Sequence, residues 1–307
     1  MKPPAFDYHR PGSVAEALRV LADLGPDAKV LAGGQSLVPL LNMRLAAPKA
    51  LVDINRLVDL AYIQTSAEAV RVGALTRHTH LTRAGAHDAV LPILAQATRN
   101  VAHQTIRNRG TTVGSIVHAD PAGELPAVLL LCDGSVQIHS AAGERDVPAA
   151  DFFLGPLESA VRPGELAVSA TFGVPSGRTG SAWLEVSRRA GDYAMCGVGV
   201  IVALAEDGTI ASARAAYNSV GPTPVLVDLT DAVGGSAPDS ADWAAAGVLA
   251  QGRVDPEEDI HATADYRLHL VGVLTARAGK SAAEHAATRP ATPQAAADGD
   301  MRRRFGG

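Results

Sequence analysis

Two short segments rich in glycine and hydroxyl residues have the composition of phosphate-binding turns. The first follows an apolar run and consists of Gly33-Gly34-Gln35-Ser36-Leu37. Glycine carries no Cβ and tolerates positive φ, so consecutive backbone N–H groups can converge on an anion there, and Ser36 can add a hydroxyl donor. The second runs from Ile106 to Pro126 and places small hydroxyl residues around one glycine: Thr111, Thr112, Gly114 and Ser115. Two such turns in separate subdomains could hold the two ends of one elongated dinucleotide.

The elements around the first turn predict one compact strand-and-helix unit, residues 1–56. Ser13 followed by Glu16 is a capping box, and apolar residues recur at helical spacing until Gly25-Pro26, which predicts a helix over residues 14–24. Short strands are expected over residues 29–32 and 50–54. The first turn therefore follows a strand.

A second unit of mixed α+β character is predicted over residues 57–176, and it contains the second turn. Strands are expected at 69–74, at 165–174 and in a hairpin from 135 to 147 around Ala142-Gly143, with helices at 92–99 and 126–132. The glycine- and serine-rich stretch Ser176 to Ser181 is the best linker candidate. These landmarks separate the first 176 residues from the remainder of the chain.

A C-terminal domain is predicted over residues 177–285, with its sheet first and its helices after. Strands at 182–186, 197–205 and 210–218 form an antiparallel meander, and helices come next at 241–251 and 265–278. The composition of residues 286–307 is typical of a disordered tail. Its basic run, Arg302 to Arg304, is interpreted as solubilising rather than as a docking segment.

Composition narrows the function classes. The chain has 307 residues, 47% of them hydrophobic, and a formal net charge of −5, which argues against nucleic acid as the main partner. No apolar run is long enough to span a bilayer, and the start Met1-Lys2-Pro3-Pro4 lacks the apolar region of a secretory signal, so the expected location is the cytoplasm. The only cysteines, Cys132 and Cys196, lie in apolar stretches, and two thiols cannot ligate an iron–sulfur cluster by themselves.

Collinear motifs carry a resemblance over nearly the whole chain. These are Ala32 to Leu37, Arg107 to Ser115 with its continuation His118-Ala119-Asp120-Pro121, Ser187 to Ala194, and Ile260 to Arg267. In order and spacing they resemble the FAD-binding medium subunit of molybdenum hydroxylases, the group that contains xanthine dehydrogenase and aerobic carbon monoxide dehydrogenase. Several collinear motifs make a far more specific signal than any one of them.

The resemblance implies an α+β fold, in which a two-subdomain FAD-binding domain of the PCMH type precedes a C-terminal domain of antiparallel sheet and helices. It implies that FAD lies between the subdomains, with its pyrophosphate on the two glycine turns and Tyr193 near the isoalloxazine ring. The implied cofactor-binding residues are Val30, Leu31, Ala32, Gly33, Gly34, Gln35, Ser36, Leu37, Val101, Thr111, Thr112, Gly114, Ser115, Asp120, Glu124 and Tyr193.

The implied activity is electron transfer within a heterotrimer. A large subunit would carry molybdopterin, and a small subunit would pass electrons from two [2Fe–2S] clusters to FAD in this chain, which hands them to an external acceptor. A dimer of such heterotrimers is expected. No catalytic side chain and no metal ligand is assigned here, because the cofactor carries the chemistry.

Two positions depart from the family pattern. The family usually has two glycines in the second turn, where this chain has Val113-Gly114. If the first of these needs positive φ, a β-branched residue there is strained by roughly 1–2 kcal/mol. Glu185 stands near the place where some relatives carry a lysine.

Other polar residues have competing interpretations. His78, His80 and His87 are assigned to the surface or to helix ends rather than to a metal site, because no carboxylate or cysteine cluster accompanies them. His118 and Asp120 could form a general-base pair, although shaping the loop near the flavin is favoured. Arg188-Arg189 could bind phosphate or form an ion pair with an acidic partner.

Two further functions remain open. One is a self-contained flavin oxidase or reductase, which would need a large substrate domain and usually an attaching His or Cys. The other is a nucleotide-binding scaffold without redox function, motivated by Val113.

Overall fold

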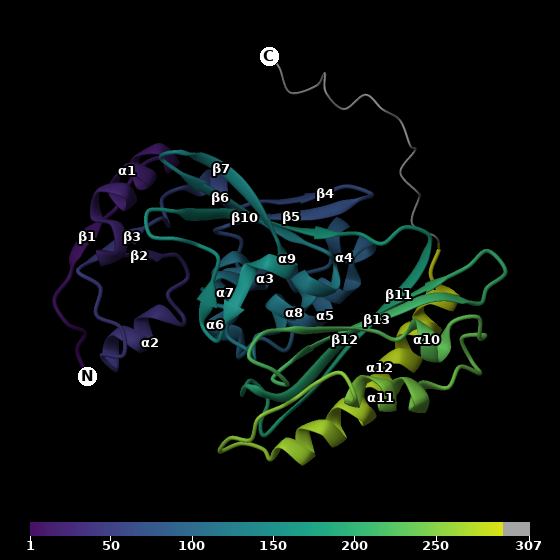
Figure 1. Ribbon diagram of the computed structural model, residues 1–307. Helices are drawn as coiled ribbons and strands as arrows, with labels where there is room; N and C mark the ends of the chain where they lie inside the picture. Colours follow the sequence, from purple (N-terminus) through teal and green to yellow (C-terminus); the bar gives the residue numbers. More distant parts are fainter. Residues whose placement is uncertain (291–307) are drawn as a thin grey trace.

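The structure is a computed structural model that describes residues 1–290 (Figure 1). Its first unit is a parallel three-stranded sheet in the order β1-β3-β2, made of β1 (Asp7–His9), β3 (Ala50–Asp53) and β2 (Ala28–Leu31). Helix α1 (Val14–Leu24) begins where the capping box predicts, because Ser13 Oγ accepts the N–H of Glu16 at 3.1 Å. A 3₁₀ turn (Gly25–Asp27) follows it, and α2 (Leu37–Asn42) comes after β2.

The second unit is a five-stranded antiparallel sheet in the order β4-β5-β10-β6-β7. Its strands are β4 (Ile63–Thr65), β5 (Ala69–Gly73), β10 (Leu166–Gly173), β6 (Ser135–Ser140) and β7 (Gly143–Pro148). A 3₁₀ turn (Val58–Leu60) precedes the first of these strands. The segments between the strands contain α3 (His78–Leu81), α4 (Ala86–Val90), α5 (Pro92–Thr98), α6 (Gln104–Arg107), α7 (Thr112–His118), α8 (Glu124–Leu131), α9 (Ala149–Phe152), β8 (Phe153–Gly155) and β9 (Glu158–Ser159).

The C-terminal unit is an antiparallel sheet in chain order, with helices on both of its faces. Its strands are β11 (Arg178–Ser187), β12 (Ala194–Leu204), β13 (Ile210–Asn218) and β14 (Val225–Asp228). On one face lie α10 (Thr230–Val233), α11 (Trp243–Gln251) and α12 (Ala264–Thr288), as Figure 1 shows. The other face packs on α5 and α8 of the second unit, since Trp183 of β11 and Ala216 of β13 belong to the core that those helices share.

The α+β class is confirmed, and four details of the prediction need correction. The meander has a fourth strand, β14, and the expected linker is partly strand, because β11 begins at Arg178. The second turn is a helix, α7. Helix α12 continues to Thr288, so residues 286–288, which composition assigns to the tail, are helical; they continue the face that packs on β11, where Ala286 is fully buried. Residues 291–307, including Arg302 to Arg304, lie outside the described residues.

The end of the fourth motif has a structural role. Thr263 caps α12, and Arg267, one turn later, is only 5% exposed. Its guanidinium donates to the carbonyl oxygens of Met195 at 2.8 Å and Ser219 at 2.7 Å, and it pairs with Asp259 at 2.7 Å. Arg267 thus ties the helix to the ends of two strands.

Replacing Arg267 by methionine is expected to lower the free energy of unfolding by about 3 kcal/mol, because two buried carbonyl oxygens lose charged donors. Chemical denaturation of the full chain measures the change. Arg277→Met, on an exposed position of the same helix, is the control and should stay within about 0.5 kcal/mol of the parent. Equal losses in both variants would contradict this role.

Candidate functional site

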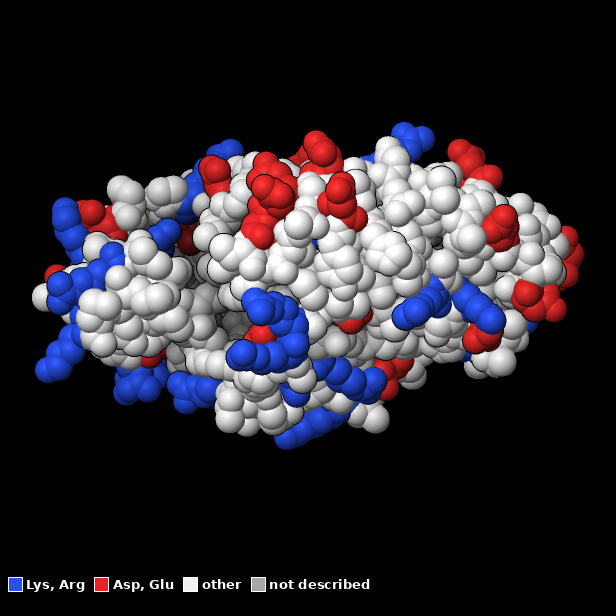
Figure 2. Space-filling view, turned by 90° about the horizontal axis from the view of Figure 1, so that it is seen from below, with Lys and Arg blue, Asp and Glu red and all other residues white. Residues whose placement is uncertain are grey.

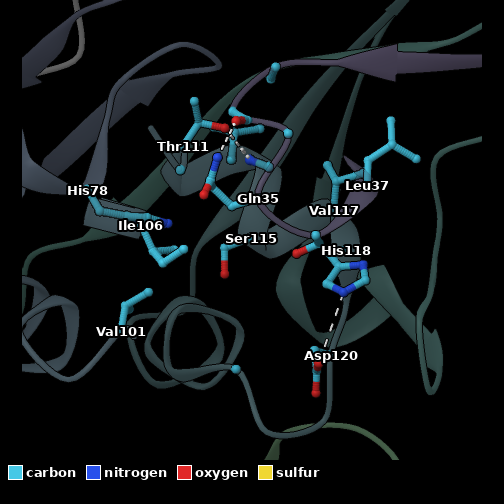
Figure 3. Close-up of a pocket in the computed structure, with 18 of the residues that line it drawn as sticks. Gln35, Leu37, His78, Val101, Ile106, Thr111, Ser115, Val117, His118 and Asp120 are labelled. Atoms are coloured by element: carbon cyan, nitrogen blue, oxygen red, sulfur yellow. Dashed lines mark hydrogen bonds and ion pairs between the residues drawn. The ribbon is translucent and has the colours of Figure 1, made fainter. Parts of the chain in front are cut away.

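A cavity of about 600 Å³ opens where the three units meet. Residues of β2 and the loop after it form one wall, α7 and its preceding residues form another, and Tyr193 reaches the cavity from the C-terminal unit. Figure 3 shows Gln35, from the loop after β2, and Thr111 and Ser115, from the start of α7, around the same space. Cavities of roughly 300–1,000 Å³ are typical for cofactors and other small ligands.

The first wall is the loop that leaves β2. Gly34 has φ +73°, a conformation that side-chain-bearing residues rarely adopt, so this glycine turns the chain toward α2. Gly33 has another role: a Cβ there would lie 2.6 Å from the carbonyl oxygen of Arg109. Glycine at residue 33 therefore lets the first wall touch the second, and the Gln35 side chain donates back to Gly33 O at 3.0 Å.

The second wall is the first turn of α7. Thr111 is its N-cap and accepts the N–H of Gly114 through Oγ1 at 3.2 Å. Val113 lies inside this helix, buried to 2% exposure, and it is absent from the residues of positive φ. The condition for strain at Val113, a positive φ, is therefore not met, because a valine adopts the helical conformation without such strain.

A network of polar contacts holds the two walls together. Asn55, just after β3, donates through Nδ2 to Ala32 O at 2.8 Å in the first wall. Arg77 donates to Asn55 Oδ1 at 2.6 Å and also to the carbonyl oxygen of Arg109, in the segment that leads to α7. Arg77 thus fixes the position of each wall relative to the other.

His78 lies in the cavity wall and stays neutral. It is 3% exposed, and its Nδ1 has no hydrogen-bond partner in the described structure. Burial, with the nearby charges of Arg107 and Arg77, lowers the pKa of His78 to about 4. His78 and His87 are buried and lie at the starts of α3 and α4, so of the two places expected for them the helix ends apply, whereas His80 is exposed.

The opposite end of the cavity is acidic. Asp120 and Glu124 line it, and His118 Nε2 lies 4.0 Å from Asp120 Oδ2 (Figure 3). Glu124 begins α8 and is 9% exposed, while Tyr193 as a whole residue is 65% exposed. His118 and Asp120 thus lie at the cavity, and nothing in the structure distinguishes a general-base role from a loop-shaping one.

Most of the residues expected to bind a cofactor come together in this cavity. Leu31 and Thr112 are the exceptions: Val30 and Ala32 face the cavity, so the alternation of a strand turns Leu31 away, and Thr112 is fully buried. Other residues also line the cavity, and most of them are apolar. They include Ile54, Ala74, Ala102, Ile106, Val117, Val161 and Leu166, together with the buried His78. Their positions are scattered along the chain, and no local motif marks them.

Basic side chains gather beside a hollow on the face seen in Figure 2. Arg188 and Arg189 are exposed, in the loop that brings Gly191 and Tyr193 to the cavity. The loop rests on His103, since a Cβ at Gly191 would overlap the His103 ring. Within the described residues, neither arginine forms an ion pair.

Both cysteines are buried, and burial raises the pKa of each thiol to about 12. Residues 1–290 contain no cluster of three or more His, Cys, Asp or Glu side chains suited to a metal ion. No helix in the same part of the chain is long and apolar enough to cross a bilayer.

Two features of the cavity fit a dinucleotide such as FAD. Two walls from separate units line one space, with Gly33 and Gly34 on one side and Gly114 on the other. The space continues from these walls to the acidic end and to an aromatic ring. The fold and the site together define a nucleotide-binding protein with a separate C-terminal unit.

Comparisons with known proteins identify the family. Residues 4–175 match the FAD binding domain in molybdopterin dehydrogenase, and residues 181–282 match the CO dehydrogenase flavoprotein C-terminal domain. The chain therefore belongs to the FAD-binding subunits of molybdenum hydroxylase-type oxidoreductases, and FAD is its cofactor.

Individual relatives agree over almost their full length. The chain is 44% identical to 6-hydroxypseudooxynicotine dehydrogenase complex subunit alpha of Paenarthrobacter nicotinovorans, over 90% of this chain and 94% of that protein. Carbon monoxide dehydrogenase of Hydrogenophaga pseudoflava, solved without the Mo-pyranopterin moiety of its molybdenum cofactor, superposes with a TM-score of 0.87 at 35% identity, covering 93% of this chain and 99% of that one. Quinoline 2-oxidoreductase of Pseudomonas putida 86 superposes with a TM-score of 0.86 at 36% identity, covering 94% of this chain and 100% of that one.

Proposed function

We propose that this chain relays electrons in a molybdenum hydroxylase complex, from iron–sulfur clusters of a small subunit to FAD and then to an external acceptor. The single observation that supports this most is the two-walled cavity in a chain of this family. Bound FAD would supply the redox chemistry, since it can take up and release electrons singly or in pairs. Substrate hydroxylation would take place at molybdenum in a large subunit, in a dimer of heterotrimers located in the cytoplasm.

The residues of this chain would bind and orient FAD. Backbone N–H groups at Gly33 to Ser36 would hold the pyrophosphate on one side. The start of α7, Thr111 to Ser115, would face it on the other side, where the N–H groups of Thr112, Gly114 and Ser115 already donate within the protein and the Ser115 hydroxyl group can donate. His78 would remain an uncharged wall residue at physiological pH because of its lowered pKa. The exposed Tyr193 ring, beside Asp120 and Glu124, would cover the isoalloxazine end and limit the access of water.

Arg77→Met is expected to weaken FAD binding about tenfold, because the two walls lose the guanidinium that joins Asn55 to the Arg109 carbonyl. Quenching of flavin fluorescence on titration with the FAD-free chain measures the dissociation constant. Arg83→Met, an exposed arginine of the same unit, is the matched control. Unchanged affinity in Arg77→Met would show that the contact does not position the walls.

Purification of the intact complex through a tag on this chain tests the electron-transfer role. The expected result is three polypeptides with molybdenum, iron and FAD, whereas the isolated chain contains FAD alone and does not oxidise the substrate of the complex. In the complex, substrate added without oxygen should bleach the FAD absorbance. A chain that oxidises substrate unaided would contradict the proposal.

The two alternative functions make different predictions for the isolated chain. In a self-contained oxidase with covalent flavin, acid precipitation would leave the flavin in the protein pellet. In a scaffold without redox function, the protein would be colourless and could not be reconstituted with FAD. The unstrained conformation of Val113 removes the observation that motivated the scaffold.

A further inference from the structure

Three residues form a row across the C-terminal sheet beside the cavity. Glu185 of β11 pairs with Gly197 of β12, and Gly197 pairs with Asn218 of β13. Residues paired directly across strands point to the same face of a sheet. Trp183, two residues before Glu185, lies in the core shared with α8, so this face is the one that meets the FAD-binding units. Glu185 therefore faces them too.

Asn218 connects this row to the start of α8. Its Nδ2 donates to Ala122 O at 2.8 Å, and the N–H of Ser219 donates to Pro121 O at 2.8 Å. A Cβ at Gly197 would collide with Asn218 Oδ1, so the row has space only because residue 197 is glycine. Glu124 follows Ala122 by two residues. The strand pairing and these bonds bring Glu124 and Glu185 to the same place between the units.

The carboxyl group of Glu124 is buried and accepts a hydrogen bond from its own backbone N–H. Glu124 is 9% exposed and lines the cavity, and no other residue in positions 1–290 donates a hydrogen bond to its side chain. Glu185 accepts one bond, from Trp183 Nε1 at 3.2 Å. Burial raises the pKa of Glu124 and the charge of Glu185 raises it further, while burial also raises the pKa of Glu185. Two buried carboxylates that repel each other do not ionise together near neutral pH.

The charged groups around Glu124 and Glu185 favour the retention of one proton by this pair. Asp120 adds negative charge near Glu124, and the Tyr193 hydroxyl group faces the same carboxylates. Arg107 is the opposing cation, but its guanidinium already donates to Val101 O and Ala102 O at 2.8 Å each. The neutral thiol of Cys196, next to Gly197 in β12, belongs to the core on the opposite face of the sheet.

Asn218 provides a separate indication of a missing donor. Its Oδ1 is buried and has no hydrogen-bond partner within the described residues. Because Asn218 Nδ2 is bound to Ala122 O, Asn218 Oδ1 is the atom that faces Gly197 in the row. A protonated carboxyl group is the donor that the row can offer to such an acceptor.

We propose that Glu124 and Glu185 share one proton at neutral pH, so that Glu185 keeps the Glu124 carboxyl group uncharged where it faces the FAD cavity. Glu185 is then a positioning residue that acts on the cavity through Glu124. Its role toward FAD rests on the proposed function, whereas the shared proton is a property of the chain alone. Removing the charge of Glu185 would let Glu124 release the proton to solvent and place a negative charge at the acidic end of the cavity.

Infrared difference spectroscopy of the full chain without FAD tests the shared proton. The parent should show a carboxylic acid band at pH 7 that disappears as the pH is raised. In Glu185→Gln the midpoint of this loss should fall by at least about one pH unit, since the repulsion is gone. Glu185→Asp should restore part of the shift, and Glu158→Gln, on an exposed glutamate, should leave the midpoint unchanged. No acid band in the parent at pH 7, or an unchanged midpoint in Glu185→Gln, would overturn the proposal.

Thermal unfolding gives a second readout for a variant that folds poorly. A carboxyl group whose pKa is raised in the folded state contributes stability below its unfolded pKa and loses it as the pH rises through the folded value. The melting temperature of the parent should therefore fall more between pH 6 and pH 9 than that of Glu185→Gln. With FAD bound, the reduction potential at pH 7 should be lower in Glu185→Gln than in the parent. If the chain binds no FAD, the proposed function fails while the infrared test still applies.

Discussion

Replacing Gly33 by alanine is expected to weaken FAD binding about 100-fold or more. The new Cβ would lie 2.6 Å from Arg109 O and 2.8 Å from the Cα of Gly110. Both are backbone atoms of the segment before α7, so only a separation of the two walls relieves the overlap. Hydrogen bonds from N–H groups to a charged phosphate contribute about 1.5–3 kcal/mol each, and losing one or two accounts for this effect.

Fluorescence titration of the FAD-free chain measures the loss in Gly33→Ala. The control is Gly12→Ala in the same unit, where the nearest atom to a new Cβ is Glu16 Oε2 at 3.7 Å and no positive φ is involved. The control should bind FAD like the parent. Parental affinity in Gly33→Ala, with an unchanged melting temperature, would mean that contact between the walls is not required for the site.

Replacing Gly180 by alanine is expected to destabilise the C-terminal unit by about 3 kcal/mol. Gly180 lies in β11 against the last turns of α12, and a Cβ there would collide with the backbone nitrogen of Ala286 and the carbonyl oxygen of Ala282. These atoms belong to a helix and cannot rotate away as a side chain can. Overpacking of this kind costs about 1–3 kcal/mol where side chains can adjust, and more where the backbone must move.

Tryptophan fluorescence during urea unfolding reports on this unit, because the two tryptophans of the chain, Trp183 and Trp243, belong to β11 and α11. Gly252→Ala is the control in the same unit: residue 252 ends α11 with φ −75°, and the nearest atom to its Cβ is 3.5 Å away. An unchanged midpoint in Gly180→Ala would contradict the close packing of α12 on β11.

Local signals explain which elements the sequence predicts well. The helix at residues 14–24 has its cap, its apolar face and its stop within one short segment, and its predicted bounds match α1. In contrast, α7 contains threonine, valine, glycine and serine, which have low helix propensity. Burial of Val113 and Ile116 stabilises this helix, and that burial depends on distant elements. Local composition therefore predicts the second turn without its helical form.

The site shows the same difference between features with a local sequence signal and features that depend on distant elements. Glycine segments near Gly33 and Gly114 are visible in the sequence, and the structure places both at one cavity. The contact of Gly33 with Arg109 and the proximity of Glu124 to Glu185 each join residues from separate units. Such contacts result from the packing of the units, which no local pattern encodes.

A crystal structure of the full chain grown with FAD tests the central claim most directly. The expected result is an FAD molecule in the cavity between the walls, with pyrophosphate oxygens within hydrogen-bonding distance of residues 33–36 and 111–115 and its ring near Tyr193 and Glu124. FAD bound at another place on the chain, or a cavity that remains empty at saturating FAD, would contradict the account.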